Sequence, residues 1–188
     1  MNAPAKNSVE IWKHFHWTFF VHVQGLIISL GRFRSRLNDR DLESARTELL
    51  TAADLLCASG AAMELAGNFS RQDYEQVVRP SMMPPAVSRE NFSGLMSWDH
   101  ATLIELWQEL RPLFKNLPTE LEAAHRDFVE AYQFLATSHR AVCERFGGGE
   151  SGSLRNGEEL GVDVLDLFQK SRNRLIDPNQ TSGCPVHA

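Results

Sequence analysis

Hydrophobic residues recur every three or four positions along most of the chain, and this period predicts helices rather than strands. We expect the first helix to run from Ser8 to about Leu37. Its core-facing stripe is predicted to consist of Ile11, Phe15, Phe19, His22, Ile27, Leu30 and Phe33. No stretch shows sustained alternation of apolar and polar residues between hairpin turns, so we predict no sheet.

Turn and capping signals divide the rest of the chain into further helices. The expected spans are 42–65, 70–78, 100–115, 118–146 and, from Glu158 or Glu159, about 159–176. The prolines between 79 and 96 cannot continue a helix, and we predict a long irregular segment there. The pattern therefore predicts an all-α, single-domain bundle of about five or six helices over residues 1–188, with flexible tails at 1–7 and 178–188.

Composition narrows the class of protein. The 188 residues carry a formal net charge of -5, which argues against a nucleic-acid partner because phosphate binding needs a basic face. The longest apolar stretch, Trp17 to Leu30, is broken by polar residues and falls short of a membrane span of roughly 20 residues. Without a signal-like start, and with three cysteines in no metal-like spacing, we expect a cytoplasmic protein in a reducing compartment.

The predicted helix 118–146 carries the main candidate for chemistry. Its residues His125, Tyr132 and His139 follow one another at steps of seven and should share one face. The small residues Gly147 to Ser153 come next. They follow a helix rather than a strand and lack the Gly-Lys-Ser/Thr ending of a phosphate loop, so we interpret them as a mobile flap over a ligand.

A helix-borne histidine such as His139 can ligate heme iron. The chain also offers an alanine-rich helix that a flat ligand could approach, aromatic walls from Phe134 and the first helix, and Arg140 or Arg145 for the heme propionates. From spacing alone, an ordinary packed or exposed histidine is the more common interpretation of His139. The same holds for His22, which lies among Phe19, Val21 and Ile27 and would otherwise line a ligand pocket.

A second kind of metal site remains open. Glu122 and His125 form the Glu-x-x-His element of carboxylate-bridged di-iron bundles. Such a site needs a second copy and further carboxylates, and the chain has no second Glu-x-x-His. A solvated helix face is the more common interpretation of this pair.

The segment from Ser138 to Leu165 resembles a known family. Ser-His139-Arg-Ala-Val-Cys-Glu-Arg-Phe-Gly, followed by Gly-Gly-Glu-Ser-Gly-Ser and Gly-Val-Asp-Val-Leu, is similar to the C-terminal signature of tryptophan 2,3-dioxygenase and the heme-dependent aromatic oxygenases. Phe19 to Gln24 resembles the family's Phe-Ile-Val-x-His-Gln segment, with the histidine displaced by one position. Phe92 to Ser97 resembles its Ser-Gly-Phe-Gln-Ser stretch, without the arginine that should follow.

The resemblance implies a compact member of that superfamily with heme b. His139 would be the proximal iron ligand and His22 the distal catalytic residue, while Tyr132 shares the heme face. The expected substrate-binding residues are Trp17, Phe20, Ser93, Gly94, Ser151 and Ser153. The implied reaction inserts oxygen from O2 or peroxide into an indole-like or other aromatic amino-acid-derived substrate.

A non-catalytic heme- or small-ligand-binding bundle is the alternative that the residues leave open, and the di-iron bundle is the other. We also expect a homo-oligomer, a dimer or a tetramer, because the aromatic start of the first helix would leave a large apolar patch uncovered.

Overall fold

The computed structural model describes residues 3–87, 97–150 and 159–179. Five long helices dominate this part of the chain: α1 (Ala3–Asn38), α2 (Leu42–Ala66), α5 (Trp98–Lys115), α6 (Glu122–Arg145) and α7 (Gly161–Ile176). A short helical segment made of α3 (Arg71–Asp73), η1 (Tyr74–Val78) and α4 (Arg79–Ser81) follows α2. The single-turn 3-10 helix η3 (Thr119–Leu121) precedes α6, and the described residues contain no strand.

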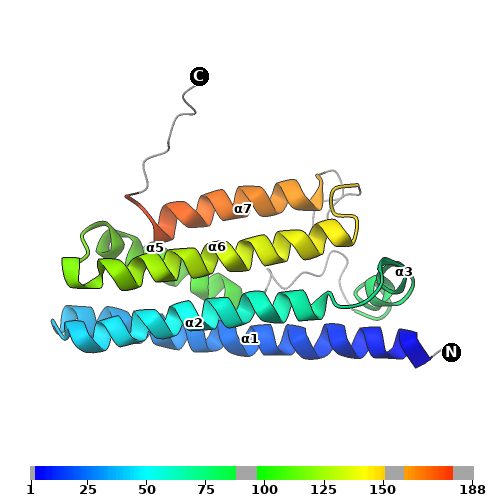
Figure 1. Ribbon diagram of the computed structural model, residues 1–188, viewed down its shortest axis with the longest axis horizontal. Helices are drawn as coiled ribbons and strands as arrows, with labels where there is room; N and C mark the ends of the chain where they lie inside the picture. Colours follow the sequence, from blue (N-terminus) through cyan, green and yellow to red (C-terminus); the bar gives the residue numbers. More distant parts are fainter. Residues whose placement is uncertain (1–2, 88–96, 151–158, 180–188) are drawn as a thin grey trace, which may run out of the picture.

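The helices form an elongated bundle, in which α1 and α2 lie antiparallel, α6 packs on α2 and α7 lies on α6, while α5 contacts α1 and α7 (Figure 1). The prediction of an all-α bundle with about six helices is confirmed over the described residues. Most predicted boundaries hold within a few residues. Helix α1, however, begins at Ala3 rather than at Ser8, and Ser8 is buried and donates a hydrogen bond to the Asp73 carboxylate at 3.1 Å instead of capping.

The segment after α2 continues further than predicted. Ser70 caps it as expected, accepting a hydrogen bond from the Asp73 backbone N–H. The chain then stays helical through a π-helical turn at Tyr74–Val78 and on to Ser81. The predicted break at Arg79 is therefore wrong, because Pro80 lies in the first turn of α4, where a missing N–H costs no helical hydrogen bond.

Helix α2 is slim where it meets α6. A Cβ built on Gly60 would lie 2.6 Å from Phe134 Cε1 and 3.3 Å from the Leu135 Cα, so only glycine allows this approach. By length and composition α2 is also the one described helix that could cross a membrane, whereas the Trp17–Leu30 stretch does not qualify. Half of the relevant window is buried in the bundle, as is typical of a core helix.

The hydrophobic core consists of two clusters. The larger fills the half of the bundle away from α3, where its fully buried side chains include Phe33, Leu49, Leu110, Phe114 and Phe128. The smaller cluster lies at the α3 end, where Phe69, Tyr74, Val78 and Phe146 pack with Trp12 and Val142. Tyr74 and Phe146 stack at 4.3 Å between ring centroids.

Helix α1 faces the core with part of the predicted stripe, Leu30 and Phe33, and with two residues that were not predicted, Val23 and Leu26. Val23, Leu26, Leu30 and Phe33 are buried, whereas Phe19 and Ile27 are only partly buried at the edge of the core. The buried set follows a seven-residue register. Stepping back from Leu30 by sevens passes through Val23 to His16, so His16 rather than His22 continues the inward face.

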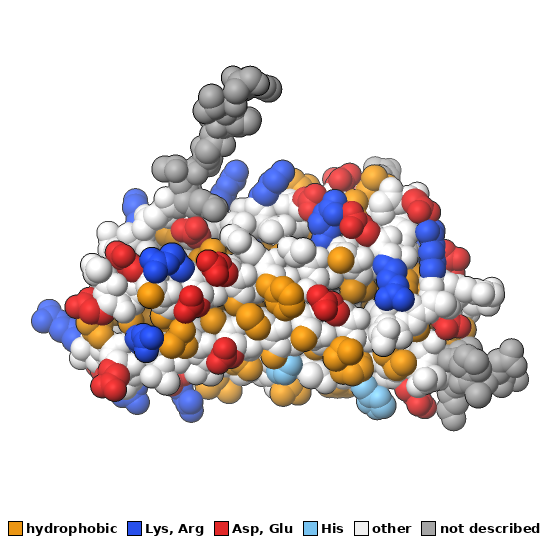
Figure 2. Space-filling view, in the orientation of Figure 1, with side chains coloured by type: hydrophobic (Ala, Val, Ile, Leu, Met, Phe, Trp, Pro, Cys, Tyr) orange, Lys and Arg blue, Asp and Glu red, His pale blue; other side chains and the backbone are white. Residues whose placement is uncertain are grey.

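Hydrophobic side chains are also visible on the outside. On the face shown in Figure 2 they form a broken band along the middle of the bundle, flanked by acidic and basic side chains. The exposed large hydrophobic residues of α1 are Trp17, Val21 and Ile28. Self-association through this surface stays a prediction.

Candidate functional site

A cavity of about 500 Å³ lies between the two hydrophobic clusters. Helices α1, α2, α5, α6 and α7 all contribute to its wall, and Tyr74, Arg79 and Met82 close the α3 end. The wall is mainly aromatic and aliphatic. Its polar side chains include three histidines, His16, His100 and His139, together with Tyr132 and Arg172.

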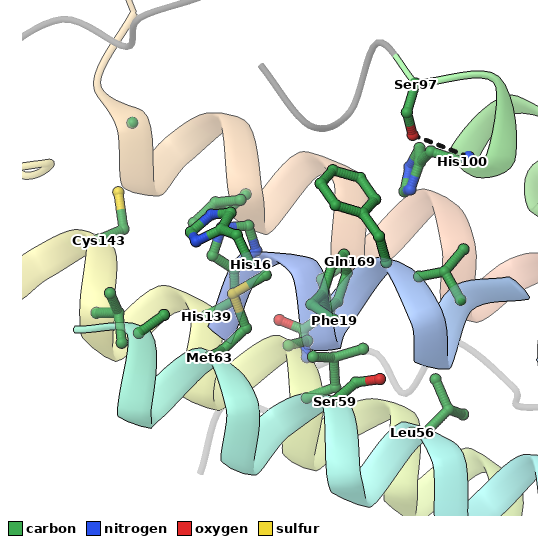
Figure 3. A pocket seen from close by; sticks show the side chains of 18 of the residues that line it. His16, Phe19, Leu56, Ser59, Met63, Ser97, His100, His139, Cys143 and Gln169 are labelled. Atoms are coloured by element: carbon green, nitrogen blue, oxygen red, sulfur yellow. Dashed lines mark hydrogen bonds between the residues drawn. The ribbon is translucent and has the colours of Figure 1, made fainter. Parts of the chain in front are cut away.

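His16 of α1 and His139 of α6 are both in this wall, and Figure 3 shows them together in the middle of the pocket. His16 Nδ1 lies 3.0 Å from the Trp12 carbonyl oxygen. A carbonyl can only accept, so Nδ1 carries the proton, and the neutral ring then has its free lone pair on Nε2. Burial lowers the pKa of His16, which keeps the ring neutral near pH 7.

His139 is neutral for a similar reason. Burial lowers its pKa to about 4, and repulsion from Arg172 and from His16 when that ring is protonated adds to this effect. No hydrogen-bond partner holds the His139 ring among the residues that the structure describes. Two neutral imidazoles from different helices thus face one cavity. Neutral imidazole is the form in which histidine binds a metal.

His22, the predicted distal residue, is not in the cavity wall. Its half-buried ring lies on another side of α1, and its buried Nδ1 has no hydrogen-bond partner. The structure places His22 outside the wall because the aromatic-rich start of α1 is compatible with two inward faces. Helix packing selects the face that carries His16, and the seven-residue register through Val23 and Leu30 was the signal that could have found it.

Three of the predicted heme contacts are also misplaced. Phe134 is 43% exposed and packs over Gly60 of α2, outside the cavity wall. Arg140 pairs with Glu144 and with Asp166, where its Nε lies 3.0 Å from Oδ1. Arg145 is exposed at the end of α6. Each lies on α6 but off the face that carries His139, so none of the three contacts the pocket.

Other predicted residues do lie in the wall. Tyr132 is buried there and meets Trp107 edge to face at 5.4 Å, while Trp17 and Phe20 line the side formed by α1. The expected alignment of His125, Tyr132 and His139 therefore holds for the last two as pocket residues. Ser93, Gly94, Ser151 and Ser153 lie outside the described residues.

His125 belongs to the packed half of the bundle instead. Its ring stacks on Phe114 at 4.8 Å between centroids, and Nε2 lies 2.6 Å from the Ile176 carbonyl oxygen. Among residues 3–87, 97–150 and 159–179, no group of three or more His, Cys, Asp or Glu side chains could hold a metal ion. The di-iron interpretation of Glu122 and His125 is therefore not supported by the described residues.

One end of the pocket carries a polar group that sequence reasoning missed. An Arg172 N–H donates to His100 Nε2 at 2.7 Å, and the guanidinium lies near the Tyr132 hydroxyl. Burial raises the pKa of Tyr132, and Arg172 partly opposes that shift. Residues 161, 164, 165, 169 and 172 line the cavity at helical spacing, which is the signal that could have pointed to Arg172.

The other end of the pocket is formed by Cys143 and the start of the glycine segment. The Gly148 backbone N–H bonds the Cys143 carbonyl at 2.8 Å, and a Cβ on Gly148 would lie 2.2 Å from the Cys143 Sγ. Burial raises the pKa of the Cys143 thiol. Glu150 in turn holds Arg71 of α3 through two N–H···O bonds, at 2.7 and 3.0 Å.

Comparison with known proteins now adds a family to this geometry. The model of the SfmD 3-methyl-L-tyrosine peroxygenase family matches residues 2–124, about two thirds of the chain. The chain belongs to this family. The matched region includes α1 and α5, which supply His16 and His100 to the pocket.

A curated relative extends the likeness. The 3-methyl-L-tyrosine peroxygenase of Streptomyces lavendulae is 29% identical over 177 residues, which cover 89% of this chain and 46% of the relative. The chain thus spans about half the length of the curated relative that it matches. No solved structure matches the chain. The predicted likeness to an oxygenase of aromatic amino acids agrees with this family, whereas membership in the tryptophan 2,3-dioxygenase superfamily stays a prediction.

Proposed function

We propose that this protein is a heme-dependent peroxygenase that hydroxylates the ring of a tyrosine-like amino acid in the cavity between its two hydrophobic clusters. The observation that carries the proposal is the pair of neutral histidines, His16 and His139, facing one apolar cavity. The name of the Streptomyces relative supports the substrate class and the use of peroxide as oxidant.

The donor set fits heme better than a bare metal ion. Neutral imidazoles on a helix are common axial ligands, and the apolar wall suits a porphyrin face. Arg79 is a cationic wall residue that could meet a heme propionate, the role predicted for Arg140 and Arg145. His139 would hold the iron, and His16 rather than His22 would be the second histidine that faces the bound group.

Heme supplies the oxygen-transfer chemistry when bound, and the protein supplies binding, orientation and a dry pocket. In the overall reaction an aromatic C–H becomes C–OH, the O–O bond of hydrogen peroxide breaks, and its second oxygen leaves as water. The ring loses two electrons and the peroxide gains them. The His16 Nδ1–H bond to Trp12 fixes that ring so that Nε2 keeps its lone pair toward the cavity.

Heme loading tests the assignment directly. We expect the wild-type protein supplied with hemin to show a strong Soret band and about one heme per chain. His139→Ala should lose stoichiometric heme, and His16→Ala should change the position of the Soret band. His22→Ala and His14→Ala, on the same helix but outside the pocket wall, are the matched controls and should behave as wild type.

The reaction is tested with the heme-loaded protein, 3-methyl-L-tyrosine and hydrogen peroxide, followed by mass analysis for a product that is 16 Da heavier. Wild-type heme content in His139→Ala would disprove the ligand assignment. A heme-loaded protein that forms a stable oxygen complex but yields no product from aromatic amino acids would instead favour the non-catalytic heme-binding alternative.

A further inference from the structure

Arg172 is a cation whose direct contacts are with neutral groups. It donates to His100 Nε2 at 2.7 Å, and it lies over the ring of Phe168, whose centroid is 4.9 Å from the guanidinium carbon. Glu105 lines a cavity wall together with Arg172. The described part of the chain contains no Asp or Glu that forms an ion pair with it. By contrast, Arg34, Arg71 and Arg140 each pair closely with a carboxylate.

The donors of Arg172 exceed the acceptors around it. A guanidinium carries five N–H groups, and His100 accepts from only one of them. Arg172 is half-buried and lies in the wall of the main cavity and also of a second one, of about 470 Å³. Charged donors near an apolar cavity are best satisfied by an anion with two oxygens in one plane, which means a carboxylate.

The position of Arg172 suits the far end of an aromatic amino acid. It lies close enough to Tyr132 to oppose the rise in the Tyr132 pKa, and Tyr132 lies seven residues before His139 on α6, or about 10 Å along the helix axis. Trp107, Phe19 and Leu103 line the wall in the same part of the bundle, and Figure 3 shows His100 and Cys143 at opposite ends of the pocket. A ring placed beside the histidine pair could therefore direct its carboxylate toward Arg172.

We infer that Arg172, positioned by His100, is the residue that binds the α-carboxylate of the substrate and so selects a free aromatic amino acid over the corresponding amine. This inference rests on the proposed function for the identity of the substrate. A heme propionate would offer the same chemistry, so the test must separate the two sources of carboxylate.

The test uses calorimetric binding to the full chain as purified, and therefore does not depend on turnover. The two probes are 3-methyl-L-tyrosine and the amine formed by removing its carboxylate. We expect wild type to bind the amino acid at least about tenfold more tightly than the amine, as a charged hydrogen-bonded pair would give. Arg172→Gln should bind the two probes with about equal affinity, whereas Arg172→Lys should retain part of the preference for the amino acid.

The matched control is Arg174→Gln, since Arg174 is an exposed arginine of the same helix and should keep the full preference. Circular dichroism and urea unfolding establish whether each variant folds. If Arg172→Gln does not fold, Arg172→Lys still provides the test. The preference should follow the guanidinium charge even if the purified chain contains no heme, so a failure of the proposed function can be told apart from a failure of this inference.

Three results would overturn the inference. One is a wild-type protein that binds the amine as tightly as the amino acid. Another is an unchanged preference in a folded Arg172→Gln variant. The third is a variant whose heme affinity, followed by Soret titration, falls while both probes weaken by the same factor, which would assign Arg172 to a propionate.

Discussion

The two halves of the bundle are built from the same helices but are filled differently. Away from α3, leucine and phenylalanine side chains such as Leu30, Phe33 and Phe128 interlock and reach zero exposure. Toward α3, the inward positions of α1 and α6 carry His16, Tyr132 and His139, and a cavity of about 500 Å³ remains. We call the half away from α3 the closed half and the half with the cavity the open half. The closed half fixes the helices relative to one another by packing, and the open half leaves polar side chains facing a cavity. The same helices therefore provide both a rigid core and a site.

The largest expected difference between the halves is in stability. Phe33→Ala in the closed half should lower the free energy of unfolding by about 3–5 kcal/mol, since a fully buried aromatic ring leaves a cavity. Trp17→Ala in the open half should cost less than about 1 kcal/mol, because Trp17 is already 69% exposed. Urea unfolding of both variants measures the contrast, and equal losses would remove the distinction between the halves.

A second difference is in the response of the heme-free protein to acid. The His139 pKa is about 4 in the folded chain against 6.5 for an ordinary histidine, so below pH 6.5 the unfolded chain binds a proton that the folded chain does not. Stability should be complete above pH 6.5 and fall as the pH drops toward 4, by at most about 1.4 kcal/mol per pH unit.

The variant His139→Leu should flatten this part of the stability curve, while His14→Leu, an exposed residue of α1, should leave it unchanged. Unfolding midpoints in urea from pH 4 to pH 7 give the measurement. A wild-type curve as flat as that of His139→Leu would mean that the open half does not hold its histidine neutral.

The smallest expected change in stability concerns Gly148, at the Cys143 end of the pocket. Gly148→Ala should destabilise the fold by about 1–3 kcal/mol, because its Cβ would lie 2.2 Å from the Cys143 Sγ and 2.8 Å from the Cys143 carbonyl oxygen. Gly149→Ala is the matched control, since nothing lies within 4 Å of a Cβ at that position. Thermal unfolding compares the two, and equal midpoints would show that the glycine segment does not pack on α6 as described.

Part of the site could be predicted because it depends on a single helix. The placement of His139 and Tyr132 on one face follows from their separation of seven residues, and both line the pocket. The buried residues of α5 also follow from the periodicity of that helix alone: Leu103, Leu106, Trp107, Leu110 and Phe114. In both cases the helical period alone determines which side chains point together.

The remaining residues of the site depend on contacts between helices. His16 had to be chosen over His22, and Arg172 had to be brought to His100, a residue 72 positions earlier in the chain. The arginines predicted near the heme, Arg140 and Arg145, lie on the wrong side of α6 because that face meets α7 and solvent. Periodicity cannot separate such cases, since it describes a helix without naming its neighbours.

The sequence by itself determined the helical class, most of the helix boundaries and the position of one pocket histidine, because hydrogen bonding and capping within a helix are local. Only the tertiary structure decided which face of α1 turns inward, where the cavity lies and which cation stands at its end. The physical reason is that burial is a property of several helices packed together. The free energy of that packing, rather than any local preference, selects His16 and Arg172 as pocket residues.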